Sequence, residues 1–116
     1  MTLKSNIMNK FNSINRVELQ GRAGTVRISP CVGHVIANFS LVTDYPIQSA
    51  EGHRLVESTW HNIAAFEGGE VYLEGLSRGV LVHLTGRLRT TKYTAADGTE
   101  RMFTEVIADS LKVVEE

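Results

Sequence analysis

The stretch VLVHLTGRLRTTKYTAADGTERMFTEVIA, residues 80–108, decides the fold class of this chain. Val80 to Thr91 is rich in residues that favour strands, and Gly86 interrupts it where a strand can bend sharply, as the corners of small barrels require. The Asp97-Gly98 pair then predicts a hairpin turn, after which Arg101 to Ala108 returns as the partner strand. We therefore expect a long, bent strand followed by a protruding hairpin.

The rest of the chain has the pattern of further short strands. Gly21 and Gly24 predict a turn or bulge after the first of them. We expect Asp44 to Ser58 to form a long exposed connection and Glu70 to Ser77 to form a short helix. Five or six strands with one short helix predict an all-β chain folded as a small barrel, closed or partly closed. The expected strands before the bent one are Val17 to Gln20, Thr25 to Ile28, Val35 to Thr43 and Thr59 to Phe66.

Length and composition favour one domain. The chain has 116 residues, of which 42% are hydrophobic, and this is enough for one core and too few for two. We expect an N-terminal arm over residues 1–14 and one folded domain over residues 15–114. Ile7, Phe11 and Ile14 have the spacing of a short amphipathic helix in the arm, and a loose terminal segment is the alternative.

The sequence contains neither a secretory signal nor an apolar run long enough to span a membrane. A single cysteine, Cys31, excludes an intrachain disulfide and fits a reducing compartment. We therefore expect a soluble protein of the cytoplasm with no membrane partner.

Aromatic and basic side chains share one predicted strand face. The period of two places Trp60 and Phe66 on one face of their strand, and it places Arg87, Arg89 and Tyr93 on one face of the bent strand. Flat rings stack on unpaired bases and guanidinium groups contact phosphates, which is the combination that sequence-tolerant binding of single strands requires. The formal net charge of −1 means that such binding depends on clustered cations. The structural alternative is a core tryptophan beside a solvated basic strand.

Six short motifs occur in a fixed order along the chain. They are Asn15-Arg16-Val17 with Gly21 and Gly24, Ala37-Asn38-Phe39-Ser40-Leu41 with Thr43, Thr59-Trp60-His61 with Phe66, Arg78-Gly79, Gly86-Arg87-Leu88-Arg89-Thr90 with Lys92-Tyr93, and Asp97-Gly98 through Val106. In order and spacing they resemble the bacterial single-stranded DNA-binding protein family, over roughly Asn15 to Val113. The resemblance implies an OB-fold, which is a five-stranded Greek-key barrel. It also implies sequence-independent binding and protection of single-stranded DNA in replication, recombination or repair, by a homotetramer or homodimer.

The resemblance also assigns roles to individual residues. Trp60, Phe66 and Tyr93 match base-stacking positions, with Tyr93 where the family commonly has tryptophan. Basic positions of the family are matched by Arg16, Arg78, Arg89 and Lys92. Strand alternation adds Arg87, because it shares the face of Arg89.

Two of the departures from the family bear on partners and assembly. The Gly/Pro/Gln-rich segment with an acidic tip that recruits replication enzymes has no counterpart, because the chain stops at Lys112 to Glu116. We therefore expect a short form without those tail-mediated partners, located in the cytoplasm at the nucleoid. Glu18 stands in the first strand, where subunits of the family pair, at a position that is usually apolar. The alternatives are a primosomal accessory OB-fold protein and a protein-interaction module with weak DNA binding.

Catalysis has little support in the sequence. The four histidines do not fall at metal-ligand spacings and no glycine-rich phosphate loop occurs. Asp97, Glu100 and Glu105 in the hairpin are interpreted as turn and solvent-facing groups. We expect neither an enzyme nor a metal site, and no cofactor.

Overall fold

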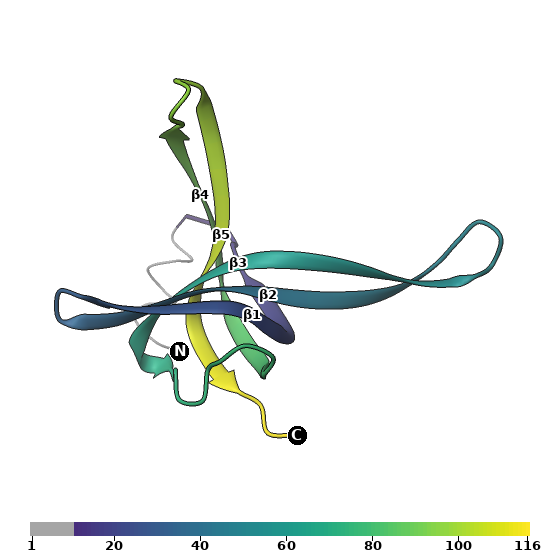
Figure 1. Ribbon diagram of the computed structural model, residues 1–116, viewed down its shortest axis with the longest axis horizontal. Coiled ribbons are helices and arrows are strands. Elements are labelled where there is room, and N and C mark those ends of the chain that lie inside the picture. The colour runs from purple at the N-terminus through teal and green to yellow at the C-terminus, as the bar shows by residue number, and fades with distance from the viewer. Residues whose placement is uncertain (1–10) are drawn as a thin grey trace.

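Five strands form a closed barrel in the computed structural model of this protein, which describes residues 11–116 (Figure 1). The strands are β1 (Val17–Cys31), β2 (His34–Gln48), β3 (Arg54–Val71), β4 (Leu81–Thr94) and β5 (Glu100–Val113). Around the barrel they follow the order β1-β2-β3-β5-β4, and β4 pairs back with β1. The β3–β5 pair is parallel, whereas the other four pairs of described strands are antiparallel. The all-β class and the five-stranded OB-fold barrel are thereby confirmed.

Strand alternation builds the core of the barrel. In β2, Ala37, Phe39 and Leu41 are buried, whereas Asn38 and Ser40 between them are only half-buried. Branched and aromatic residues on one side of each strand therefore fill the barrel, and their polar neighbours point outward. Among the described residues the core holds no buried polar or charged side chain. Its members are Ala23, Ala37, Phe39, Leu41, Ile63, Ala65, Val71, Leu73, Leu76, Val82, Leu84, Val106, Ala108 and Leu111.

Glycine-containing bulges in the β1–β2 and β4–β5 pairs bend the strands so that the barrel can close. The β1–β2 register shifts between Ala23 and Val26, and the β4–β5 register shifts between Thr85 and Gly86. A Cβ atom at Gly86 would overlap the backbone carbonyl of Ile107, so only glycine fits this corner. The bend expected at Gly86 is present. The strand expected to end at Gly21 to Gly24 instead continues through a bulge to Cys31, because β2 takes over as its partner.

Long hairpins extend from the barrel in different directions (Figure 1). The β4–β5 hairpin protrudes as expected, and its turn is held by Asp97, whose Oδ1 accepts hydrogen bonds from Thr99 N at 3.0 Å and Thr99 Oγ1 at 2.6 Å. These two bonds lower the pKa of Asp97. The radius of gyration is 16.8 Å, against about 13 Å for a compact chain of this length, because the hairpins lie outside the core.

The expectation of an exposed connection over Asp44 to Ser58 was wrong. Apart from a turn over residues 49–53, this segment belongs to β2 and β3, which stay paired from the barrel out to Gln48 and Arg54. The backbone ladder continues although the side chains are exposed, and Ser58 Oγ donates a hydrogen bond of 2.6 Å to Asp44 Oδ1 across it. Polar composition suggested a loop, whereas hydrogen bonding between strands decides the conformation.

The short helix expected over Glu70 to Ser77 is also absent from the described residues. Strand β3 runs on to Val71 beside β5, and the following turn brings Leu73 and Leu76 into the core. Gly75 adopts a positive φ of 77°, which a helix does not allow. The apolar spacing resembled that of a helix, but these leucines are buried by a turn that closes the end of the barrel.

The expected N-terminal arm is only partly covered by the structure. Residues 1–10, with Ile7 and most of the expected amphipathic helix, lie outside the described residues. Asn15 attaches the start of the described chain to the barrel. Its side chain accepts a hydrogen bond from Leu88 N and donates one to Leu88 O, both at 2.8 Å. In the described part of the chain, no helix has the length and apolarity to cross a membrane.

Substitution of Gly86 by alanine is expected to destabilise the barrel. The added methyl group would overlap the Ile107 carbonyl, so the β4–β5 ladder must shift at its bulge, and overpacking of this kind lowers the free energy of unfolding by about 1–3 kcal/mol. Urea denaturation would measure the loss, with Thr91→Ala on the same strand as an exposed control. Equal midpoints for Gly86→Ala and the original chain would show that the corner tolerates a side chain.

Candidate functional site

The outward faces of β1, β2 and β3 form one continuous surface. On β3, Trp60, Asn62 and Phe66 are exposed, whereas Ile63, Ala64 and Ala65 are buried. Trp60 is 61% exposed and Phe66 is 44% exposed. Both rings therefore lie at the surface, on one face as predicted, and the alternative of a core tryptophan is wrong.

Neighbouring strands leave room for the Trp60 ring. Val42 of β2 lies opposite Trp60 in register, and Gly24 of β1 lies close to the indole. A Cβ atom on Gly24 would come within 2.9 Å of the indole Cζ3 and would overlap Ser40 Oγ. Because Gly24 has no side chain, the Trp60 ring can pack against β1 while most of the ring remains exposed to solvent.

The basic face of β4 joins this surface through β5. Arg87 and Arg89 lie opposite Ile107 and Glu105 in the β4–β5 register, and Arg89 Nη2 contacts Glu105 Oε2 at 2.9 Å. The parallel β3–β5 register pairs Ile63 with Val106, so Glu105 is the β5 neighbour of Asn62. The predicted face of Arg87 and Arg89 therefore continues from the Trp60 face.

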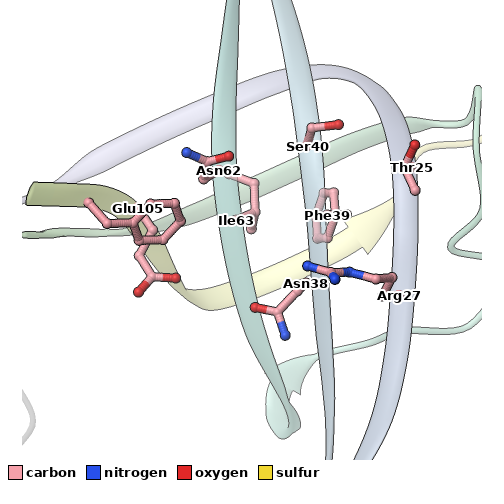
Figure 2. A pocket seen from close by; sticks show the side chains of 9 residues that line it. Thr25, Arg27, Asn38, Phe39, Ser40, Asn62, Ile63 and Glu105 are labelled. Atoms are coloured by element: carbon pink, nitrogen blue, oxygen red, sulfur yellow. The ribbon is translucent and has the colours of Figure 1, made fainter. Parts of the chain in front are cut away.

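A groove of about 360 Å³ crosses the centre of this surface (Figure 2). Glu105 lies at one end of it in Figure 2, and Thr25 and Arg27 lie at the other, with Asn62 and Ser40 between them. Its lining comes from β1, β2, β3 and β5 and consists of Thr25, Arg27, Asn38, Phe39, Ser40, Asn62, Ile63, Phe103 and Glu105.

Sequence reasoning missed most of this groove. Asn38 and Ser40 were named only as members of a family motif, although their alternation with Ala37, Phe39 and Leu41 was a signal that they point outward. Phe103 is 41% exposed and carried no separate signal, because its place beside β3 depends on the parallel pairing of β5.

Glu105 was wrongly interpreted as a solvent-facing group. Its side chain is only 11% exposed, because it lies between β3 and β4 and is paired with Arg89. A carboxylate so placed holds the Arg89 guanidinium in a defined position and adds a negative charge to the floor of the groove.

The remaining predicted residues lie around this surface. Tyr93 is 48% exposed on the β4–β5 hairpin and shares the strand face of Arg89, whereas Lys92 lies on the other face of the strand. Arg16 precedes β1 beside Arg87, because Asn15 is bonded to Leu88 and Val17 is paired with Gly86. The side chains of Arg16 and Lys92 are exposed as well.

Arg78 lies farther from the groove lining. It is exposed in the turn before β4, and the next residue, Gly79, donates a backbone hydrogen bond of 2.8 Å to Ala23 O. The structure therefore groups Trp60, Phe66, Arg87 and Arg89 on the central surface and leaves the other predicted residues at its edges.

Histidines in the barrel have partners in the protein. His61 Nε2 lies 2.8 Å from Thr43 Oγ1, and burial lowers the pKa of His61. His83 Nε2 lies 2.8 Å from Glu18 Oε2 on the outer face of β1 and β4. Within residues 11–116, no group of three or more histidine, cysteine or acidic residues has the geometry to hold a metal ion.

Comparison with known proteins is consistent across sequence and structure. The model of the single-strand binding protein family matches residues 14–114. The chain is 35% identical over 106 residues to a single-stranded DNA-binding protein of Neisseria meningitidis and 32% identical over 104 residues to one of Xanthomonas campestris. These matches cover 88% and 87% of this chain, which spans about 60% of the length of each relative.

Solved structures show the same likeness. The Plasmodium falciparum SSB in complex with ssDNA matches with a TM-score of 0.78 and 26% identity, over 89% of this chain and 97% of that one. The single-stranded DNA-binding protein of Thermus aquaticus matches with a TM-score of 0.72 at 20% identity, over 88% of this chain and 51% of that one, and it supports the fold.

The partly buried position of His61 predicts a pH-dependent stability. Burial lowers the pKa of the folded His61, so the unfolded chain binds more protons near pH 6, and the free energy of unfolding is expected to fall as the pH drops through about 6.5 toward the lowered pKa. Urea denaturation between pH 7.5 and 5.5 measures this, above the range in which carboxylates titrate. His61→Gln should reduce the change of the free energy of unfolding with pH. His53→Gln, at the exposed hairpin turn, is the control and should keep that change as it is in the original chain. An unchanged slope in His61→Gln would contradict the prediction.

Proposed function

The chain belongs to the single-strand binding protein family, and we propose that it binds and protects single-stranded DNA without requiring one sequence. The observation that carries this proposal is the joining of exposed rings and cations on one outward surface of the barrel, with Trp60 and Phe66 beside Arg87 and Arg89. Stacking platforms next to phosphate-binding side chains are what single-strand binding requires.

Trp60, Phe66 and Tyr93 are proposed to stack on bases. All three are between 44% and 61% exposed, so a base can reach each ring without rearrangement of the core. Phosphates are assigned to Arg87 and Arg89 on the central surface and to Arg16, Arg78 and Lys92 at its edges. If these cations neutralise five phosphates, a plot of the logarithm of the binding constant against the logarithm of the salt concentration should have a slope of about −3.5, at ~0.7 per phosphate.

Self-association is proposed as well. Val17 to Gly21 of β1 pair with β4 on one side, whereas the pairing with β2 begins at Arg22. Within the described residues, one edge of this segment is therefore open, and an unpaired strand edge is a template for a second copy of the chain. Glu18 on this segment has a partner in His83, so a charge there is compatible with pairing. A homodimer or homotetramer is the proposed assembly.

Residues 15–114 are proposed as the functional domain, with residues 1–14 as an arm. The role is one of binding, in replication, recombination or repair at the nucleoid of the cytoplasm, and not of catalysis. Relatives of the same family carry the name single-stranded DNA-binding protein, which supports this choice.

A fluorescence titration with oligo-dT tests the proposal. Trp60 is the single tryptophan of the chain, so quenching of its emission reports a base against its ring. Tyr93→Ala is expected to weaken binding roughly 5- to 150-fold, as the loss of one stacked base worth ~1–3 kcal/mol predicts.

Tyr72→Ala provides the matched control. Tyr72 is also an exposed tyrosine, at 58%, but it follows the end of β3 that is far from Trp60. Its removal should leave affinity and quenching unchanged. Absence of both quenching and binding in the original chain would overturn the proposed function and favour a barrel that serves protein partners.

A further inference from the structure

We propose that a second groove, at one end of the barrel, docks an extended segment of another protein that carries apolar side chains next to lysine or arginine. This hairpin groove lies between the β1–β2 hairpin and the end of β3 with the turn that follows it, and its volume is about 520 Å³. It shares no lining residue with the central groove, so the inference goes beyond the proposed binding of DNA and does not depend on it.

The hairpin groove exists because two neighbouring parts of the barrel diverge. The β2–β3 pairing ends at Ile36 and Phe66, whereas β1 and β2 stay paired to the tip of their hairpin. Beyond this point β3 leaves β2 through a bulge in which Gly68 and Gly69 have positive φ values of 136° and 56°. The two walls of the groove therefore come from different elements, the hairpin and the end of β3.

The floor of the hairpin groove is apolar and is continuous with the core. Val71 and Leu73 line it, and both are buried members of the core. The walls are much more open, since Ile28 is 52% exposed and Tyr72 is 58% exposed. An apolar side chain that entered the groove would thus cover Ile28 and Tyr72 and extend the packing of the core.

Two carboxylates decide which apolar segment fits. Glu67 and Glu74 line the hairpin groove, and both are exposed. Neither forms an ion pair with another residue in the range 11–116, and no lysine, arginine or histidine of that range lines the groove. Its negative charge attracts cations and repels phosphates. The groove therefore favours a basic protein segment over a nucleic acid.

The backbone of the bulge also suits a peptide. Within the described strands, Glu67, Gly68 and Gly69 have no register partner in β2 or β5. The β2–β3 pairing ends before them at Phe66, and the β3–β5 pairing resumes after them at Glu70. A Cβ atom on either glycine would have no atom beyond its chain neighbours within 4 Å, so the space beside both is open. An extended segment can approach this stretch closely and form backbone hydrogen bonds with it.

Pairing of two copies does not use the hairpin groove. The open edge proposed for self-association runs from Val17 to Gly21, whereas β1 contributes Ile28 to the groove. The two sites therefore occupy different halves of the same strand, and a dimer paired through that edge can still dock a third chain.

Selection from a library of random short peptides displayed on phage tests the proposal. The full chain is the bait, and oligo-dT in excess occupies the central surface. Enriched peptides are expected to combine several apolar residues with a neighbouring lysine or arginine. The most enriched sequence is then synthesised with a fluorescent label, and its affinity for the full chain is measured by fluorescence anisotropy.

Variants of the groove locate the binding site. Glu67→Lys combined with Glu74→Lys should weaken binding of the labelled peptide by about tenfold or more, because attraction becomes repulsion. Tyr72→Ala should weaken it by about fivefold or more, because an apolar wall is lost. Glu51→Lys combined with Glu57→Lys is the matched control, since it makes the same change of charge at exposed residues of the outer β2–β3 hairpin and should leave the peptide affinity unchanged. Urea denaturation checks that each variant is folded.

Titration with oligo-dT separates the hairpin groove from the proposed DNA surface. Tyr72→Ala should weaken the peptide and keep the affinity for oligo-dT, whereas Tyr93→Ala should do the reverse. Absence of enriched peptides, enriched peptides without basic residues, or a peptide whose affinity either groove variant leaves unchanged would overturn the docking site and leave the proposed function standing.

Sedimentation velocity distinguishes a second copy of the chain as the occupant. The groove variants should have the same mass as the original protein in solution, and a lower mass would assign the hairpin groove to self-association and overturn the proposal. Failure of oligo-dT binding alone would overturn the proposed function and leave the docking site standing.

Discussion

Closure of the barrel through β1 is the constraint on which the rest of this structure depends. One strand pairs with β4 along Val17 to Arg22 and with β2 along Arg22 to Cys31, so it completes the ring. Once the barrel is closed, each strand has one face toward the core and one toward solvent. The strand register then fixes the face on which each side chain lies. The bulges after Ala23 and at Gly86 make the bending possible and set the register of the strand segments beyond them.

Closure also separates a fixed surface from exposed hairpins. The central surface lies directly over the core, where Ile63, Ala65 and Val106 are buried, so its side chains have well-supported backbones. The outer part of the β2–β3 hairpin is different, because its paired strands have no buried side chains beyond the barrel. Segments with few buried apolar contacts open most easily. The central surface therefore offers side chains at fixed positions, whereas the outer hairpin can adapt its shape.

The central surface carries charges of both signs. The net charge of the chain is −1, yet Arg27, Arg87 and Arg89 share the surface that contains Glu105. The Arg89–Glu105 pair is more than a solvated ion pair, because the carboxylate is largely shielded and holds the guanidinium in place. The electrostatic potential of this surface therefore depends on where these groups lie, and the net charge of the chain does not show it.

Local sequence patterns were sufficient to predict several strand faces, one turn and one strand bend of this protein. The period-two alternation placed Trp60 and Phe66 on one face, the Asp97-Gly98 pair marked the hairpin turn, and Gly86 marked the corner. These features depend on neighbours in the chain, so they can be read from it. Six motifs in order were enough to indicate the family and hence the barrel.

Tertiary structure decided what depends on residues that are distant in sequence. Asp44 to Ser58 looks like a loop until its partner strand is known, and the helix expected over Glu70 to Ser77 gave way to a turn because β5 and the open end of the core lie beside it. The groove arises in the same way, since Asn62 and Glu105 are 43 positions apart and meet only through the parallel β3–β5 pairing. The sequence by itself determined which residues alternate and turn, whereas barrel closure decided which of them meet, because strand partners are set by the packing of the whole chain.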